Sequence, residues 1–442
     1  MSYSPTFRAA IALLALPAAL TAQAASDSLA ARPIALRDAV ALAEQNGLAA
    51  IQARGQIRSA ESGVRAAKAA LLPSLSISLG QVNQSGERLD AQGRLVPYLA
   101  SQPWTYSTGL NSSINLFDGG RRFNEVKRAR YDVGAAEANE VTQKYNATLL
   151  VKTQYYTILA AREAEGAAQA QLQQAQEQLK TSIVRTNAGV VTLSDSLRSV
   201  IAVGNAQLAL LTARNNVRVS SAVLTRLIGS ETPVTAQPSD TLDSAMQPVD
   251  STFLASLLDQ GPVVRQTEAQ LESAKSAVRS AKTSYLPSVD LSYSRSGNGF
   301  DRTYGLGGNP LAYTNQFRLN LSYALFNNFQ REDALTRADV QADLVAAQLR
   351  DAKLGAQQTL VQQLAAVRTA QQRILLQQAT IDAAKEDLRV QQQRYALGAS
   401  TMLDVLTSQS TLDAARSALI QARQDVRIAR AQLEALIGRD LP

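Results

Sequence analysis

The 442-residue chain contains no cysteine and no histidine. It therefore cannot form a disulfide, a zinc–thiolate or histidine-based metal site, or a Ser-His-Asp or Cys-His nucleophilic arrangement. The lack of cysteine also excludes an N-terminal lipidated cysteine. Only chemistry based on carboxylates or lysines is left. Because we find no nucleotide-binding motif either, we expect no catalytic site, no metal and no cofactor.

Aromatic residues and long apolar runs are also scarce. Aromatic side chains make up 5% of the chain, while Ala and Gln are abundant, which suits long thin helices better than a thick globular core. Beyond the first residues, no segment approaches the roughly 20 consecutive apolar residues of a membrane-spanning helix. A membrane crossing by the mature chain would therefore have to use strands.

The first residues have the pattern of a secretory signal peptide. Arg8 supplies a positive charge, residues 9–16 are apolar, and Ala-Gln-Ala at 22–24 has the small-x-small pattern of a cleavage site. The apolar stretch is too short for a hydrocarbon core of about 30 Å, and Pro17 follows it, so we do not interpret it as an anchor. We expect residues 1–24 to be removed.

Charges of both signs are spread along the chain. There are 44 Lys and Arg against 37 Asp and Glu, a balance of +7 that becomes +6 without Arg8. Interspersed signs are typical of solvated helix faces, whereas a nucleic-acid-binding surface gathers basic residues. We therefore expect no nucleic-acid partner.

The second half of the chain repeats the first. Matches at an offset of 214 residues include Gly47 with Gly261, Gln52 with Gln266, Arg65 with Arg279, and Leu72-Pro73-Ser74 with Leu286-Pro287-Ser288. Matches at an offset of 209 include Leu116 with Leu325, Gly189 with Gly398, Asp195 with Asp404, and Leu227-Ile228-Gly229 with Leu436-Ile437-Gly438. A constant offset over such distances indicates a tandem duplication.

The change of offset lies in segments rich in Gly, Pro and polar residues, which we interpret as loops because length changes cost little there. We assign residues 25–229 to the first repeat and 251–442 to the second. Residues 230–250 contain three prolines and are interpreted as the linker. Each repeat is expected to run helix, strand, long loop, strand, very long helix, tight turn and long helix.

Four segments alternate apolar and polar residues, at about 74–84, 104–117, 287–296 and 316–326. One apolar face over about 10 residues is typical of a membrane-barrel strand. A single such strand would more often belong to a half-buried soluble sheet, but four at matched repeat positions favour a barrel. The aromatic residues near the strand ends, which are candidates for membrane-interface girdles, are Tyr98, Trp104, Tyr285 and Tyr313.

Residues 119–187 and 328–396 contain no proline and have a helical pattern throughout. At 1.5 Å per residue, each would reach about 100 Å if unbroken. Apolar residues recur every seven positions in the second segment and again after its turn: Leu360, Val367, Ile374, Ile381, Leu388 and Tyr395, then Val405, Leu412, Leu419, Val426 and Leu433. Such a stripe predicts antiparallel coiled-coil neighbours. An isolated coiled-coil hairpin or filament remains an alternative.

The duplicated strand pairs, the Leu-Pro-Ser junctions and the long helices that turn at Gly189 and Gly398 resemble the TolC family of outer-membrane efflux proteins. The most specific element is the pair of turns, at 187–195 and 396–404, which resemble the family's periplasmic tip. The resemblance implies a mixed α+β membrane protein with an internal tandem repeat. In such a fold, antiparallel coiled-coil helices form a periplasmic α-barrel, and four strands per chain contribute to a trimeric 12-stranded outer-membrane β-barrel.

The resemblance also implies a function and partners. The chain would be a homotrimeric exit duct in the outer membrane of a Gram-negative cell, extending into the periplasm among outer-membrane lipids. Substrates would arrive from an inner-membrane pump of the RND or ABC type through a periplasmic adaptor protein. They would cross passively, in an efflux or type I secretion system. The absent lipidation cysteine resembles the branch that includes type I secretion ducts.

By the same resemblance, the two turns hold a pore gate. Asp404 matches a position whose three copies ring the entrance, although a second acid one turn on is replaced by Thr407. Tyr395 and Asp195 match a hydrogen-bonded latch of the closed state, and Ser194 with Ser400 match a second link. The residues implied to dock the adaptor are Gly189, Val190, Leu193, Gly398, Ala399 and Leu403.

Simpler interpretations of these residues are open at this point. Asp195 and Asp404 lie near predicted helix N-termini, where a carboxylate stabilises the helix by itself. As a carboxylate pair they would also suit acid–base hydrolysis, but no aromatic cleft surrounds them in the sequence. A periplasmic or surface coiled-coil structural protein would explain the seven-residue pattern but not the strand pairs.

Overall fold

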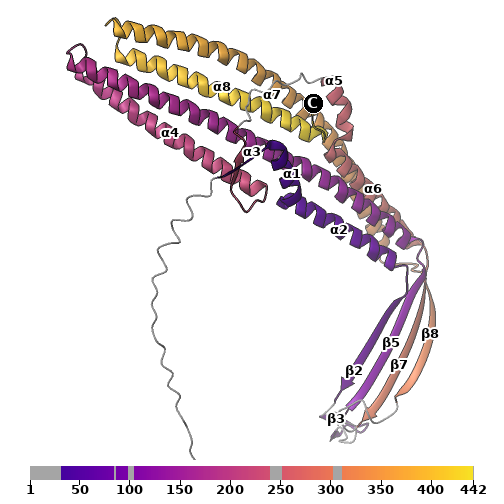
Figure 1. The fold of residues 1–442 in the computed structure, drawn as a ribbon. Coiled ribbons are helices and arrows are strands. Elements are labelled where there is room, and N and C mark those ends of the chain that lie inside the picture. Colours follow the sequence, from indigo (N-terminus) through magenta and orange to yellow (C-terminus); the bar gives the residue numbers. More distant parts are fainter. Residues whose placement is uncertain (1–30, 84–85, 98–103, 239–250, 302–310, 442) are drawn as a thin grey trace, which may run out of the picture.

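The computed structural model describes residues 31–83, 86–97, 104–238, 251–301 and 311–441. The predicted signal peptide, Tyr98 and the second part of the predicted linker lie outside these ranges. The molecule is elongated, with long helical hairpins at one end, a curved sheet at the other and the C-terminus near the middle (Figure 1). This agrees with the expected long thin shape.

The elements alternate along the chain in the order expected of a duplication. The helices are α1 (Leu36–Asn46), α2 (Leu48–Ala69), α3 (Arg121–Asn187), α4 (Leu193–Leu227), α5 (Ser251–Leu257), η1 (Leu258–Gln260), α6 (Pro262–Lys282), η2 (Thr283–Tyr285), α7 (Gln330–Ala396) and α8 (Met402–Ile437). The strands are β1 (Arg32–Ile34), β2 (Ser74–Val82), β3 (Glu87–Leu89), β4 (Leu95–Pro97), β5 (Trp104–Phe117), β6 (Val234–Ala236), β7 (Ser288–Asp301) and β8 (Ala312–Ser322).

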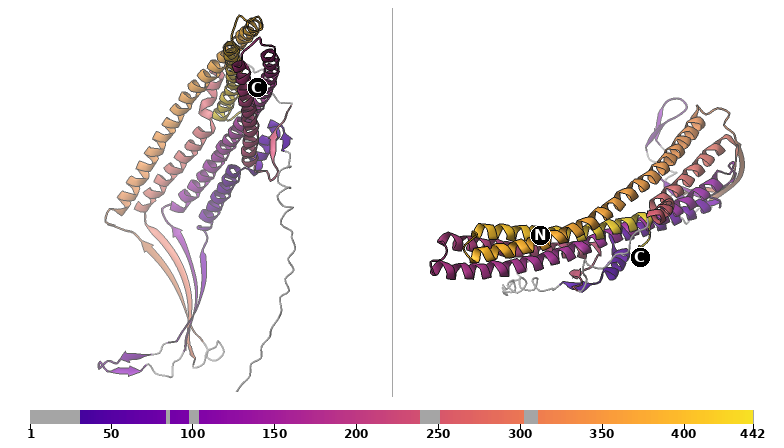
Figure 2. Two further views of the ribbon diagram at one scale, coloured as in Figure 1. Left: turned by 90° about the vertical axis from the view of Figure 1, so that its left-hand side faces the viewer. Right: turned by 90° about the horizontal axis from the view of Figure 1, so that it is seen from above.

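The two repeats lie side by side and share one sheet. Its order is β2-β5-β7-β8, and every neighbouring pair is antiparallel, so β5 of the first repeat pairs with β7 of the second. Each strand adjoins a helix, and the helices α2, α3, α6 and α7 pack in the same lateral order (Figure 2). One repeat thus extends the layer begun by the other.

Beyond this layer, α3 pairs with α4 and α7 pairs with α8 as antiparallel hairpins. The predicted seven-residue stripes form the contact between α7 and α8. Leu360, Val367, Ile381, Leu388 and Tyr395 of α7, and Val405, Leu412, Leu419, Val426 and Leu433 of α8, are buried, while Ile374 is partly buried. The coiled-coil prediction is confirmed, because a seven-residue repeat keeps one side of each helix facing its partner.

One exposed face of the sheet is mainly apolar, as the alternation predicts, although Arg295 lies on it because it pairs with Leu110. On β2 the exposed fractions of Leu75, Ile77 and Leu79 are 69, 73 and 76%, and on β8 those of Phe317 and Leu319 are 77 and 68%. Residues that pair across the strands point to the same side. The opposite face carries Ser, Asn and a few charged residues, such as Asp290, which pairs with Asn320.

The bounds of the last two strands correct the sequence prediction. The third strand is longer than 287–296, because β5 provides pairing partners as far as Asp301. The fourth spans Ala312–Ser322 and not 316–326, because Ser322 pairs with Ser288, the first residue of β7, and no partner lies beyond it. Leu325 and Phe326 therefore belong to the turn that leads into α7, although they continue the apolar alternation.

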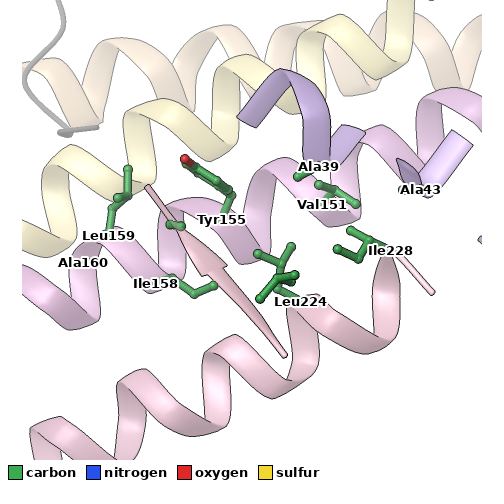
Figure 3. Close-up of a cluster of buried hydrophobic side chains, with 11 residues drawn as sticks. Ala39, Ala43, Val151, Tyr155, Ile158, Leu159, Ala160, Leu224 and Ile228 are labelled. Carbon is green, nitrogen blue, oxygen red and sulfur yellow. The ribbon is translucent and has the colours of Figure 1, made fainter. Parts of the chain in front are cut away.

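The middle of the molecule holds a small core that the sequence did not reveal. β1 pairs in parallel with β6, and all three residues of β6 are buried. The Tyr155 hydroxyl donates to the Ile34 carbonyl oxygen (3.0 Å) and accepts from the Gln237 amide (3.1 Å). Figure 3 shows the buried side chains between α1, α3 and α4 beside β6. The first part of the predicted linker, 230–250, is therefore a packed strand, too short to show a period in sequence.

Among the described residues, no helix combines the length and the hydropathy needed to cross a membrane.

Candidate functional site at the hairpin tips

The turns at the far ends of the two hairpins have the same backbone design. Gly189 (φ 72°) and Gly398 (φ 75°) are in the left-handed region, where a side chain would strain the backbone. The next amide in each turn donates back into the preceding helix, from Val190 to the Arg185 carbonyl (2.9 Å) and from Ala399 to the Arg394 carbonyl (2.8 Å). Each glycine thus closes its helix with a C-cap and reverses the chain.

A cleft of about 550 Å³ lies between the two turns. It brings together four predicted gate residues, Asp195, Tyr395, Ser194 and Ser400. Two of the predicted docking residues, Val190 and Gly398, also line it, together with Arg185, Val191, Thr192, Arg198, Ala396, Leu397 and Thr401. Residues more than 200 positions apart in the sequence therefore form one site, because the duplicated hairpins end side by side.

Tyr395 and Asp195 lie near one another but do not form the predicted latch hydrogen bond in this structure. Tyr395 is 7% exposed, and its buried hydroxyl has no hydrogen-bond partner among the described residues. Burial, followed by the negative charge of Asp195, raises the pKa of the Tyr395 hydroxyl. The ring packs in the core that also holds Leu388 and Met402.

Asp404 caps α8. Its carboxylate accepts from the Thr401 amide (2.9 Å) and hydroxyl (2.8 Å) and from the Ser400 hydroxyl (3.0 Å), while its own amide donates to the Thr401 hydroxyl (3.3 Å). The reciprocal bonds form a capping box. The Thr401 backbone bond, then the two hydroxyl bonds, lower the pKa of Asp404. The capping interpretation therefore holds for Asp404, which is also exposed at the tip.

Sequence reasoning missed Arg185 and Thr401. The Arg185 guanidinium lies over the Tyr395 ring, 4.9 Å from its centroid, and donates to the Tyr395 carbonyl oxygen. No local pattern marks this residue, because its contact is made across the two repeats. Thr401 follows the rule that Thr often precedes a helix, so its capping role was open to prediction.

A second cavity, a groove of about 470 Å³, runs beside the tips between α3, α4 and α8. Leu403, one of the predicted docking residues, lines it together with Ile201 and Gln409. On its floor, Gln409 accepts from Gln174 (2.6 Å) and donates to both carboxylate oxygens of Asp413 (3.0 Å each). Burial raises the pKa of Asp413. The exposed Leu193 and Leu197 continue this apolar surface along α4.

Within the described ranges, no group of three or more acidic side chains is arranged to hold a metal ion. The tips present helix caps, apolar surface and charged side chains.

Long hairpins that end in glycine turns, joined to a sheet with an apolar exposed face, define the class of outer-membrane export ducts. The chain belongs to the outer membrane efflux protein family, whose sequence model matches residues 39–230 and 253–439. The predicted resemblance to the TolC family is thereby confirmed, as is the predicted mixed fold of long helices and a few strands with an internal repeat. The protein resides in the outer membrane and serves as an exit duct.

Individual relatives are distant but match along most of their length. The chain is 28% identical to the pyoverdine export outer membrane protein OpmQ of Pseudomonas aeruginosa, covering 90% of this chain and 82% of the relative. It is 23% identical to the outer membrane protein TolC of Escherichia coli, covering 85% and 76%. The crystal structure of VceC from Vibrio cholerae superposes with a TM-score of 0.73 at 18% identity, covering 92% and 97%.

The family consists of ducts and not of enzymes. The coiled-coil structural protein is therefore not retained, and family membership gives no support to the hydrolytic alternative built on Asp195 and Asp404.

Proposed function

We propose that three copies of this chain assemble into one continuous duct. The single observation that carries the proposal is the four-stranded sheet with its apolar exposed face and its two free edges, β2 and β8. In a bilayer, an open edge leaves backbone groups without hydrogen bonds, which is costly. Joining β8 of one copy to β2 of the next, three times, removes every edge and gives a barrel of twelve strands.

The helical part supports the same assembly. Leu208 and Leu211 on α4 are 64 and 68% exposed, and Val361 and Leu375 on α7 are 69 and 65% exposed. Apolar side chains spread along two outer helices in this way need a cover. Neighbouring copies would supply it if the layer of helices closes into a tube as the sheet does.

The duct would complete a tripartite system. Relatives are named as export proteins of the outer membrane, and a passive duct needs energy from a pump elsewhere. The tips, at the end farthest from the sheet, would meet a periplasmic adaptor that links the duct to an inner-membrane pump of the RND or ABC type. The groove with Leu403 and Ile201, and the exposed Leu193, offer the adaptor an apolar contact.

The gate assignments stay predictions. Three copies of Asp404 would ring the entrance, where like charges repel and favour either opening or cation binding. The Tyr395 and Asp195 latch would form in a conformation that brings the carboxylate to the unpaired hydroxyl. Tyr395→Phe is then expected to raise the open fraction of single channels in planar bilayers, and an unchanged fraction would remove the latch.

The first experiment is the size and shape of the mature protein in detergent. Light scattering during size-exclusion chromatography is expected to give three copies per particle. Electron microscopy is expected to show a tapered three-fold particle longer than about 100 Å, the reach of a 67-residue helix. A monomer or dimer without a barrel would overturn the proposal.

A further inference from the structure

The tip contains one arginine that joins the two hairpins. Arg185, in the last turn of α3, donates from both terminal nitrogens to the Tyr395 carbonyl oxygen (3.3 and 3.4 Å) and from one of them to the Ala396 carbonyl oxygen (3.2 Å). These carbonyls belong to the last turn of α7, where the helix dipole favours a cation, and the Tyr395 oxygen also accepts from the Gly398 amide (3.1 Å). The same guanidinium stacks on the Tyr395 ring.

The duplication supplies a natural comparison. Arg394 is the repeat equivalent of Arg185, at the offset of 209, and it also lies in the last turn of a long helix. Its guanidinium donates to the Ala399 carbonyl oxygen (3.4 Å), within its own turn. Two arginines at matched positions therefore differ in what they hold: Arg394 contacts its own hairpin, whereas Arg185 reaches the other one.

Arg185 lies at the outer end of the contact between the two hairpins, and other residues continue this contact toward the interior. Val191, in the first turn, packs against the apolar core of the second hairpin. Below it, the side-chain amide of Gln178 from α3 lies 3.5 Å from the sulfur of Met402, a residue with 0% exposure. A movement that separates the two tips must break the Arg185 contacts and would uncover the side of Met402 that faces Gln178.

We propose that Arg185 is a positioning residue that fastens the α3–α4 hairpin to the end of α7 and so sets how readily the entrance opens. Its role as a gate element rests on the proposed function as a duct whose entrance is at the tips. The fastening itself does not depend on that function.

The fastening is tested by the accessibility of position 402. The chain has no cysteine, so Met402→Cys provides a single thiol. In this background, Arg185→Gln is expected to raise the rate of modification by a membrane-impermeant maleimide about tenfold, the effect of losing a few charged hydrogen bonds and one stacking contact. Arg394→Gln is expected to leave the rate unchanged. Equal rates in the two variants would overturn the proposal.

Arg185→Lys keeps the charge but loses the planar fork and the stacking, so its labelling rate is expected to lie between those of the wild type and Arg185→Gln. This variant also covers the case in which Arg185→Gln does not fold. A rate for Arg185→Lys equal to that of Arg394→Gln would then argue against the fastening.

Single-channel recording separates this inference from the proposed function. If the duct is correct, the parent protein conducts in planar bilayers, and Arg185→Gln opens more often or to a larger conductance than Arg394→Gln. A parent that does not conduct would overturn the duct and leave the labelling result to decide the fastening. Conduction that is identical in both arginine variants would remove Arg185 from the gate.

Discussion

At the scale of single residues, Asp195 and Asp404 occupy equivalent positions in the two repeats but make different hydrogen bonds. Both are the third residue of a helix, after Thr192 and Thr401. Thr401 forms a capping box with Asp404, whereas Thr192 makes no side-chain capping bond. Asp404→Ala is therefore expected to speed amide hydrogen exchange in the first turn of α8 roughly fivefold.

Asp195→Ala is the matched control, and it should affect the first turn of α4 much less. The pH dependence follows from the pKa of Asp404, which its hydrogen bonds lower below the usual 3.8. A lowered pKa means that the bonds contribute stability above the unfolded value and lose it as pH falls through the folded value. Protection of α8 should therefore be constant from pH 7 to about pH 5. Loss of protection within that range would contradict the capping role.

The same residues show what sequence could predict at the tip. Repeat offsets and the resemblance placed Asp195, Tyr395 and Ser400 near one another, and the structure brings them to one cleft. They did not place Arg185, since a residue that contacts its own turn and one that crosses to the other hairpin look alike in sequence. Nor did they show that the Tyr395 hydroxyl is unpaired, which depends on how the ring packs.

At the scale of elements, the two faces of β8 differ in the residues they are expected to tolerate. Leu319 is 68% exposed on the apolar face and pairs with Leu291, while the next residue, Asn320, pairs with Asp290 on the polar face. If the apolar face meets lipid, Leu319→Arg should cost at most about 2–4 kcal/mol, the cost of an arginine at the middle of the bilayer. Asn320→Arg should cost little, because that face would line the water-filled duct.

Gel migration before and after heating measures this difference, since a folded membrane barrel migrates faster than its heated form. Leu319→Arg is expected to lose most of the fast form and Asn320→Arg to keep it. Equal loss in both variants would mean that the apolar face does not meet lipid. The comparison is tight because the two positions are adjacent and share the same strand neighbours.

Helices with a long run of regularly spaced apolar residues were predicted well. Strands whose ends depend on hydrogen-bonded pairing with another strand were predicted poorly. The seven-residue stripe from Leu360 to Tyr395 predicted α7 and the side of it that packs against α8, because the buried residues of that side recur every seven positions. The predicted end of β8 was wrong because Leu325 continues the alternation of apolar and polar residues but has no neighbouring strand with which to pair. β1 and β6 were missed because three residues show no period and their pairing joins distant parts of the chain.

At the scale of the whole molecule, a buried ion cluster ties the repeats together. Lys152 of α3 lies 2.5 Å from a carboxylate oxygen of Glu434 in α8 and 3.0 Å from Asp440. The side chains of Lys152 and Glu434 are 14 and 11% exposed. Arg430 also lies near Glu434, at 3.7 Å, and the Leu441 amide donates to the Glu434 carboxylate (3.3 Å). The first repeat is thereby joined to the last turn of the second and to the residues after it.

Lys152→Met should destabilise the protein by about 3 kcal/mol, because it leaves the buried Glu434 carboxylate without its shortest ionic partner. Lys144→Met is the control: Lys144 lies on the same helix and bridges Glu44 at 3.2 Å, but it is 53% exposed, so its loss should cost at most about 1 kcal/mol. Unfolding of both variants by denaturant gives the comparison. Equal losses would show that the cluster is no stronger than a surface pair.

The pH dependence of the Lys152 effect gives a second test. Burial alone would lower the pKa of Lys152, but hydrogen bonds and charge from Glu434 and Asp440 outweigh it and raise the pKa above its usual 10.5. A raised pKa means that the contribution is complete below the unfolded value and is lost as pH rises through the folded value. The difference between wild type and Lys152→Met should therefore be constant from pH 7 to about pH 10 and shrink only beyond it. A difference that shrinks near pH 8 would mean that Lys152 is not held by these carboxylates.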